Sequence, residues 1–307
     1  MTIMHHDAVL VIGGSGFIGS HIVARLAAAG HQVVVPTRHL PRASHLLVLP
    51  TVQVVEADIH DDATLDRLIA QADVVVNLVG VLHSKPGNPW GPQFEQAHVA
   101  LPRRIAQACS RLGVKRCLHM CALGAASDAP SMYQRSKAAG EQIMRTTPEL
   151  EVTSFRPSVV FGPEDQFLNV FARMQAILPV MVVGGADAKF QPVFVGDLAQ
   201  AFVDALDDPQ SIGKVYELVG PHVYSLRELI RLSGTYAHHR RPVIGLPASL
   251  ARIQAFLLEH VPGGPVMSRD NLDSMKADNV ASGDFPLPPA WYPTALEAVA
   301  PHYLAPR

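Results

Sequence analysis

A glycine-rich turn near the start of the chain is the feature that most constrains what this sequence can fold into. Residues 9–30 read VLVIGGSGFIGSHIVARLAAAG, in which Gly13, Gly16 and Gly19 follow an apolar β-branched run and open a helix pattern. In such a turn the first glycine permits a tight bend, the second lets a pyrophosphate approach the backbone, and the third allows close helix–strand packing. The turn predicts a dinucleotide-binding strand–turn–helix unit, with a purely structural turn as the alternative.

Strands and helices are predicted to alternate along the first half of the chain. Strands are expected over residues 9–12, 32–37, 52–57, 74–79, 116–121 and 152–155. Helices are expected over residues 17–29, 64–71, 94–112 and 131–145, and then over 167–177, 198–206, 226–233 and 249–260. This alternation predicts an α/β fold, a Rossmann doubly wound parallel sheet with helices on both faces.

The second half of the chain has a looser pattern, and prolines accumulate after about Gly162. We predict a dinucleotide-binding Rossmann domain over residues 1–160, with residues 190–220 returning to it. Residues 161–189 and 221–307 are expected to form a smaller, partly interleaved C-terminal lobe that meets a substrate or partner.

The charge balance and the cysteines exclude some classes of protein. With 25 Lys and Arg against 27 Asp and Glu, the chain lacks the basic excess of a nucleic-acid binder. No Lys or Arg precedes Arg25 and no apolar run reaches the ~18 residues of a membrane span, so we expect no secretory signal. Three cysteines, without an H-E-x-x-H or paired C-x-x-C motif, predict no metal site and suit a reducing compartment. The expected location is cytoplasmic, or peripheral at the inner face of a membrane.

The end of the second predicted strand bears on the choice of dinucleotide. NAD sites usually place Asp or Glu there to bind the ribose hydroxyls, but none occurs between Ala8 and Val55. Arg38, with His39 and Arg42 nearby, could instead neutralise a 2′-phosphate. We therefore expect NADP(H) to be preferred and NAD(H) to be accepted, unless Arg38 is only a solvated strand-end residue.

Further cofactor contacts are expected where later strands end. Asp58 is placed to meet an adenine amino group, and Ile59 to contact the adenine ring. The segment containing Asn77, Val79 and Gly80 would pass beneath the cofactor, because ligands lie at the carboxyl ends of parallel strands.

A tyrosine and a lysine stand four residues apart in the predicted helix after the fifth strand. Tyr133 and Lys137 would share one helix face. An ammonium beside a phenol lowers the phenol pKa, which would prepare Tyr133 to exchange a proton with a carbonyl or alcohol oxygen. Lys137 could also donate to the nicotinamide ribose. A surface helix pair without chemistry is the alternative.

Together these motifs resemble the short-chain dehydrogenase/reductase superfamily, of the extended and atypical type that includes NAD-dependent epimerases and dehydratases. RPSVVFGPED (156–165) and FQPVFVGDLAQA (190–201) add to the resemblance. CALGA (121–125), KFQPVFVGD (189–197) and SRDNLDSMKADNV (268–280) resemble signatures of one subgroup, the nucleotide-binding accessory subunit of respiratory complex I and its bacterial relatives.

The resemblance implies a set of site residues. Cofactor contacts would come from Gly13, Ser15, Gly16, Phe17, Ile18, Gly19, Arg38, Asp58, Ile59, Lys137, Pro157, Ser158, Val159 and Val160. Tyr133 would be the catalytic acid/base, while Cys121 occupies the position of the superfamily's catalytic serine. A thiol is a weaker hydrogen-bond donor than a hydroxyl. Either Ser127 substitutes for it, or Cys121 is a reactive thiol or only a small buried strand residue.

The substrate is constrained by the segment around residues 189–192. Sugar-nucleotide enzymes of the extended type carry an arginine near here for the substrate diphosphate, whereas Lys189 is the only cation in this stretch. An apolar wall would suit an apolar carbonyl or a quinone, unless its members are ordinary core residues. The proposed wall consists of Phe161, Phe167, Phe171, Met174, Phe190 and Phe194.

Two classes of function follow. The first is an NAD(P)(H)-dependent oxidoreductase in which Tyr133 and Lys137 assist hydride transfer, linked to quinone metabolism or the respiratory chain. The alternative is an assembly or stability subunit that holds NADPH without turning it over; a sugar-nucleotide epimerase or dehydratase is a weaker third. The basic run 236–241 and the helix 249–260 could contact a protein or a membrane surface, or be a solvated loop and a packed helix.

Overall fold

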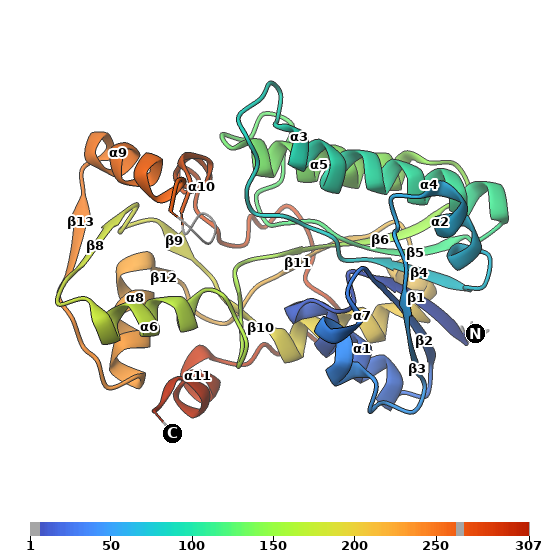
Figure 1. The fold of residues 1–307 in the computed structure, drawn as a ribbon, viewed down its shortest axis with the longest axis horizontal. Helices are drawn as coiled ribbons and strands as arrows, with labels where there is room; N and C mark the ends of the chain where they lie inside the picture. The colour runs from blue at the N-terminus through green and yellow to red at the C-terminus, as the bar shows by residue number, and fades with distance from the viewer. Residues whose placement is uncertain (1–6, 262–266, 307) are drawn as a thin grey trace.

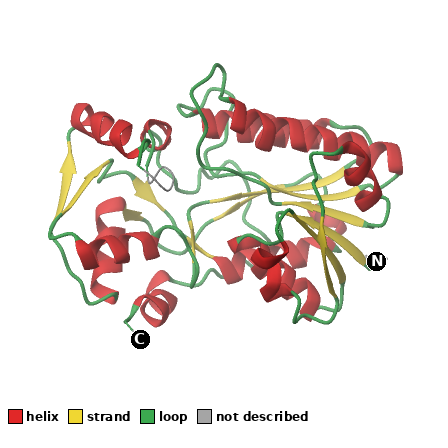
Figure 2. Ribbon diagram, in the orientation of Figure 1, coloured by secondary structure: helices red, strands yellow, loops and turns green. Residues whose placement is uncertain are grey.

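The computed structural model describes residues 7–261 and 267–306. Within them, a seven-stranded parallel sheet is the central element, and helices cover both of its faces (Figures 1 and 2). In sheet order the strands are β11 (Val215–Leu218), β6 (Glu151–Pro157), β5 (Arg116–Met120), β4 (Val74–Asn77), β1 (Ala8–Ile12), β2 (Gln32–Thr37) and β3 (Val52–Glu56).

The sheet separates two layers of helices. On one face α1 (Phe17–Ala28) packs against α7 (Val195–Leu206), and α2 (Asp62–Ile69), α4 (Leu101–Leu112) and α5 (Met132–Thr146) cover the other (Figure 1). Alternate side chains of a strand point to opposite faces. Val9 and Val11 of β1 therefore belong to the core beneath α1 and α7, and Leu10 and Ile12 to the core beneath α2 and α4. The Rossmann α/β fold that we predicted is confirmed.

The predicted strands and helices are present, with strand ends that differ by at most two residues and helix ends by at most three. The predicted helix over 94–112 is continuous from α3 (Pro92–Phe94) through a π-helical turn, η2 (Glu95–Ala100), into α4. Strand β11 was not predicted as a strand, and it joins the sheet beside β6. The exact boundaries of the two lobes stay a prediction.

The second lobe is built from helices and three short strand pairs. Its helices are α6 (Leu168–Ile177), α8 (Leu226–Tyr236), α9 (Ala248–Leu258), α10 (Arg269–Ser274) and α11 (Leu296–Leu304). Its strand pairs are β7 (Val160–Phe161) with β10 (Val193–Phe194), β8 (Met181–Gly184) with β13 (Val243–Leu246), and β9 (Lys189–Phe190) with β12 (Tyr224–Ser225). The two 3₁₀ segments that the structure describes elsewhere are η1 (Leu40–Leu46) and η3 (Pro209–Ser211).

The proposed apolar substrate wall is mostly core of this second lobe. Its six members pack in two apolar clusters with residues of α6, α8 and α11 and of β8 and β13. Of the six, Phe190 also lines a cavity with Tyr133. The interpretation as ordinary core therefore accounts for most of these side chains.

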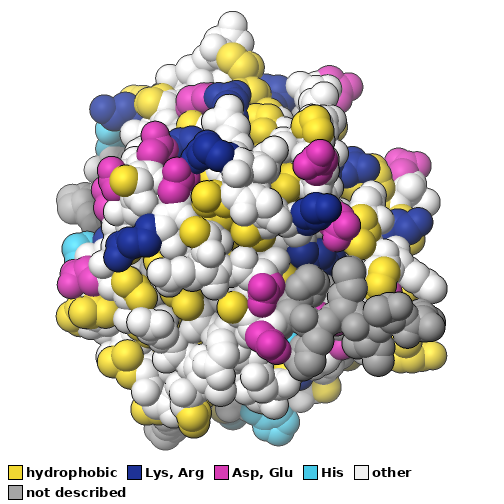
Figure 3. Space-filling model, turned by 90° about the vertical axis from the view of Figure 1, so that its right-hand side faces the viewer, with side chains coloured by type: hydrophobic (Ala, Val, Ile, Leu, Met, Phe, Trp, Pro, Cys, Tyr) yellow, Lys and Arg dark blue, Asp and Glu magenta, His cyan; other side chains and the backbone are white. Residues whose placement is uncertain are grey.

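Charged side chains of both signs are interspersed over the face in Figure 3, which is the right-hand side of Figure 1. This face therefore carries no broad basic surface, in keeping with the formal net charge of −2. On the other lobe, α9 buries Ala251 and Ala255 but leaves Leu250, Ile253 and Leu257 exposed. In the described part of the chain, no helix combines the length and the apolar character needed to cross a bilayer.

Candidate nucleotide-binding site

The glycine-rich turn joins β1 to α1 and leaves the helix N-terminus open. Gly13 has a φ of 89°, which disfavours any residue with a side chain. A Cβ at Gly19 would lie 2.3 Å from the Gly13 carbonyl oxygen, so this glycine allows the turn to fold onto the helix. A Cβ at Gly16 would meet only that same oxygen, at 3.5 Å. No side chain caps α1 at Gly16, so the first backbone N–H groups of the helix can bind an anion.

The loop after β2 presents two guanidinium groups to solvent. Arg38 follows the strand directly and Arg42 lies in η1, and both are exposed. Local bonds order the loop between them: the His39 N–H donates to Thr37 Oγ1 at 3.3 Å, and the Arg42 N–H donates to the His39 carbonyl at 3.0 Å. Arg38 and Arg42 are therefore available to an anionic ligand at this strand end.

The predicted cofactor residues after β3 and at the end of β4 differ in their exposure to solvent. Asp58 is exposed, and its Oδ1 accepts a bond from the His60 N–H at 2.9 Å. Ile59 is half-buried against the core beneath α2 and α4. Asn77 is buried, and its Oδ1 accepts from the Val79 N–H at 3.2 Å. Asn77 thus shapes the turn from inside the protein, and the passage of the segment from Asn77 to Gly80 beneath the cofactor stays a prediction.

The β4 turn meets both the glycine-rich turn and the helix that carries Lys137. A Cβ at Gly13 would lie 3.2 Å from the backbone N of Val79, and a Cβ at Gly80 would lie 3.2 Å from Lys137 Nζ. Lys137 is buried, and its ammonium donates to the Val79 carbonyl at 3.3 Å and to the Met120 carbonyl at 3.1 Å. The structure therefore brings together three of the predicted segments at the carboxyl edge of the sheet.

Tyr133 lies one turn before Lys137 on α5, as the spacing predicted. It is half-buried and lines a cavity of about 240 Å³ with Pro157, Ser158 and Val159. Burial, together with the nearby Cys121, raises the pKa of the Tyr133 phenol. The raised pKa is opposite to the lowering that we expected from Lys137. The Lys137 ammonium donates to two backbone carbonyls.

Cys121 does not face this cavity. Its thiol donates to the Lys137 carbonyl at 3.6 Å, and burial followed by the charge of Glu141 raises the pKa of the thiol to about 12. The cavity wall beyond β5 is formed by Ala122 and Leu123, which carry no hydroxyl. Ser127 lines a different cavity, with Trp90 and Arg135, and so does not substitute for the missing serine. Cys121 behaves as a buried strand-end residue rather than a reactive thiol.

The model of the NAD dependent epimerase/dehydratase family matches residues 9–219, from β1 to the end of β11. The chain belongs to this family. It is 32% identical over 285 residues to a mouse protein named NADH dehydrogenase [ubiquinone] 1 alpha subcomplex subunit 9, mitochondrial, covering 90% of this chain and 73% of that one. It is 31% identical over 273 residues to the Neurospora crassa NADH-ubiquinone oxidoreductase 40 kDa subunit, mitochondrial, covering 88% and 71%.

A solved structure of this fold supports the assignment at the level of architecture. The Bacillus cereus UDP-glucuronic acid 4-epimerase, in complex with UDP-glucuronic acid and NAD, superposes with a TM-score of 0.69 at 19% identity. The match covers 97% of this chain and 98% of that one.

The location that we predicted is corrected by these relatives. We expected a cytoplasmic protein, or one peripheral at the inner face of a membrane. The relatives of about one-third identity are named as mitochondrial proteins. Composition and the absence of long apolar runs do not distinguish compartments in which thiols stay reduced, so the sequence offered no signal for this difference.

One buried histidine that contacts Tyr133 was not predicted to have a role in the site. His98, in the π-helical turn η2, is buried; its Nε2 accepts from the Val81 N–H at 3.0 Å, and its Nδ1 lies 2.8 Å from Ser136 Oγ. Burial and the Lys137 charge lower the pKa of His98 to about 2, so the ring is neutral and its Nδ1–H donates to Ser136. Its ring packs edge-on against Tyr133 with centroids 5.5 Å apart. His98 thus connects the loop after β4 to α5 through two hydrogen bonds. A single histidine within a helical pattern does not predict such a role.

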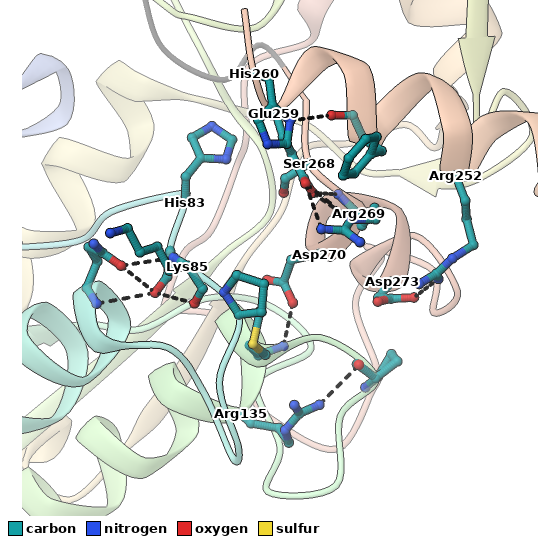
Figure 4. A pocket seen from close by; sticks show the side chains of 16 residues that line it. His83, Lys85, Arg135, Arg252, Glu259, His260, Ser268, Arg269, Asp270 and Asp273 are labelled. Carbon is teal, nitrogen blue, oxygen red and sulfur yellow. Dashed lines mark hydrogen bonds and ion pairs between the residues drawn. The ribbon is translucent and has the colours of Figure 1, made fainter.

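A second, larger cavity, drawn in Figure 4, is lined by other residues of α10 than the first. It measures about 710 Å³ and lies between the loop at His83 and Lys85, the start of α5, and helices α9 and α10. Two ion pairs stand on its wall, Arg269 with Glu259 at 3.0 Å and Arg252 with Asp273 at 3.1 Å. The described residues place no three His, Cys, Asp or Glu side chains where they could hold one metal ion.

Proposed function

We propose that this chain binds a nicotinamide dinucleotide, NADP(H) in preference to NAD(H), and holds it as a component of a protein assembly. The observation that carries the proposal is the open cradle at Gly16, where the α1 N-terminus has no side-chain cap and an added Cβ meets only one atom. The binding of NAD is general to the family; the preference for NADP(H) is specific to this proposal and rests on Arg38 and Arg42.

Residues of the candidate site would hold each part of such a ligand. The turn from Gly13 to Gly19 would hold the pyrophosphate, and Arg38 the 2′-phosphate. An ammonium has three donors and Lys137 uses two of them, so one remains for a ribose hydroxyl. Pro157 and Val159 line the same cavity as Tyr133. A bound nicotinamide supplies hydride chemistry.

If Arg38 binds a 2′-phosphate, Arg38→Ala should lower the NADPH affinity roughly tenfold or more and leave the NADH affinity nearly unchanged. The physical reason is that only the phosphorylated ribose presents a charge to the guanidinium. Titration of both dinucleotides by intrinsic fluorescence or calorimetry measures this preference. Arg67→Ala, an exposed arginine on α2, is the control. Equal affinities for NADPH and NADH in the unaltered protein would contradict the assignment.

Three features of the Tyr133 cavity favour holding the dinucleotide over turning it over. The β5 end supplies Ala122 and Leu123 in place of a hydroxyl, the Cys121 thiol is directed at the Lys137 carbonyl, and the Tyr133 pKa is raised. A reacting carbonyl would therefore find no hydroxyl donor at the β5 end and would face a weakened acid–base partner in Tyr133. The names of the relatives as subunits of NADH dehydrogenase support a protein partner.

A second candidate function is an oxidoreductase acting on an apolar carbonyl or a quinone. The observation in its favour is that the Tyr133 side chain lines the same cavity as Pro157, Ser158 and Val159. In that case Tyr133 would exchange a proton with the substrate oxygen, with Lys137 close behind it.

The two candidates separate at Tyr133→Phe. If the protein only holds its dinucleotide, bound NADPH should be oxidised no faster than free NADPH by a panel of quinones, ketones and aldehydes. Tyr133→Phe should then change neither that rate nor the NADPH affinity, as followed by single-turnover absorbance. Tyr292→Phe, exposed in the second lobe, is the control. Oxidation by the unaltered protein that falls roughly 10²–10⁴-fold in Tyr133→Phe would establish the oxidoreductase instead.

A further inference from the structure

Helix α10 is a partition between the two cavities. Asn271, Ser274 and Met275 line the cavity that contains Tyr133, whereas Arg269 and Asp270 line the larger one. The helix lies in the segment 268–280, which neither the dinucleotide cradle nor the acid–base pair accounts for. Whatever fixes α10 therefore fixes one wall of the proposed nucleotide site.

The Asp270 carboxylate reaches from α10 to the first turn of α5. Its Oδ1 accepts from the Met132 N–H at 2.7 Å, and its Oδ2 accepts from the Tyr133 N–H at 3.0 Å. The first N–H groups of a helix have no partner within the helix. The N-cap residue Ser131 satisfies only the next one, accepting from the Gln134 N–H at 3.1 Å. The start of α5 is thus completed by a residue 137 positions away from Tyr133.

Asp270 is itself held in place from both sides. A capping box between Ser268 and Asn271 starts α10, and Arg269 pairs with Glu259 after the end of α9. The carboxylate is 8% exposed, and its negative charge lies against the positive end of the α5 dipole. A rigidly mounted, buried carboxylate with both oxygens bound to backbone N–H groups is a specific joint between the lobes.

We propose that Asp270 is a positioning residue that joins the second lobe to the first turn of α5 and thereby sets the shape of the cavity around Tyr133. Asp270 does not line that cavity, so it acts through Met132, Tyr133 and α10. Without the joint, both walls must be ordered when a dinucleotide binds, which lowers the apparent affinity. The affinity readout rests on the proposed dinucleotide binding, whereas the effect on α5 does not.

The test compares Asp270→Ala and Asp270→Asn with a matched control, Asp273→Asn. Asp273 lies on the same helix but pairs with Arg252 and Lys276 and makes no bond to α5. Amide hydrogen exchange at Met132 and Tyr133, and NADPH affinity by fluorescence titration, are measured on the full chain. In Asp270→Ala we expect exchange at both amides to rise at least tenfold and NADPH affinity to fall about tenfold. Asp270→Asn should give intermediate values, and Asp273→Asn values within twofold of the unaltered protein.

Two results would overturn the proposal. The first is unchanged exchange at Met132 and Tyr133 in Asp270→Ala. The second is faster exchange with unchanged NADPH affinity, which would make Asp270 a local helix cap only. If Asp270→Ala does not fold, the isosteric Asp270→Asn carries the test on the same criteria. If the unaltered protein binds no dinucleotide, the proposed function fails, and the exchange measurement still decides whether Asp270 holds α5.

Discussion

Gly16→Val should abolish dinucleotide binding while leaving the protein folded. An added Cβ at Gly16 meets only the Gly13 carbonyl oxygen, at 3.5 Å, and the φ of this residue is −81°, which valine tolerates. The branched side chain would instead occupy the space in front of the α1 N-terminus. Losing about three charge-assisted bonds to a pyrophosphate lowers the affinity by roughly 1000-fold. Fluorescence titration with NADPH measures the loss, and circular dichroism the fold.

Two further variants serve as comparisons for Gly16→Val. Ala24→Val adds the same side chain at an exposed position of α1 and should leave the affinity unchanged. Gly19→Ala places a Cβ 2.3 Å from the Gly13 carbonyl oxygen, so it should distort the turn and lower the melting temperature. Unaltered NADPH affinity in a folded Gly16→Val protein would show that this turn is not the phosphate cradle.

Arg116→Met should lower the free energy of unfolding by about 3–5 kcal/mol. Arg116 is 1% exposed, and its guanidinium donates to the carbonyls of Ala205, Leu206 and Glu151 and to Ser211 Oγ. Ala205 and Leu206 end helix α7, so this cation also faces the negative end of the helix dipole. Methionine fills similar space but donates none of these bonds. The carbonyls of Leu206 and Glu151 lose their Arg116 donor, and the Ala205 carbonyl keeps only the Ser211 hydroxyl as a side-chain donor, at 3.0 Å. Urea denaturation followed by circular dichroism measures the change.

Arg111→Met is the matched control for Arg116→Met. Arg111 pairs with Asp66 at 2.6 Å, but its side chain is 56% exposed, and water screens such a pair. The control should therefore change the unfolding transition far less. A loss of stability in Arg116→Met no larger than that in Arg111→Met would contradict the role of Arg116 in holding α7 to the sheet.

Much of the fold could be predicted because its signals are local. The alternation of short apolar runs with helical patterns placed the strands of the central sheet from β1 to β6, since the inner strands of a parallel sheet are buried on both faces. Strand β11 escaped prediction because four residues at a sheet edge carry too little pattern to mark a strand. Its place beside β6 depends on a partner some 60 residues earlier in the chain, as the pairing of Val215 with Ser154 illustrates.

The features of the candidate site also fall into those set by local sequence and those set by distant residues. The tight turn at Gly13, Gly16 and Gly19 and the shared helix face of Tyr133 and Lys137 follow from spacing alone, because backbone geometry sets them within a few residues. The direction in which Cys121 points, the neutral state of His98 and the Asp270 joint depend on neighbours from other elements. Hydrophobic periodicity indicates which side of a helix or strand is buried. It does not specify which polar group of another element will form a hydrogen bond there. The sequence by itself therefore determined six of the seven strands of the sheet and its glycine-rich turn. The tertiary structure decided the place of β11 and the walls of the Tyr133 cavity, because those contacts join residues far apart in the chain.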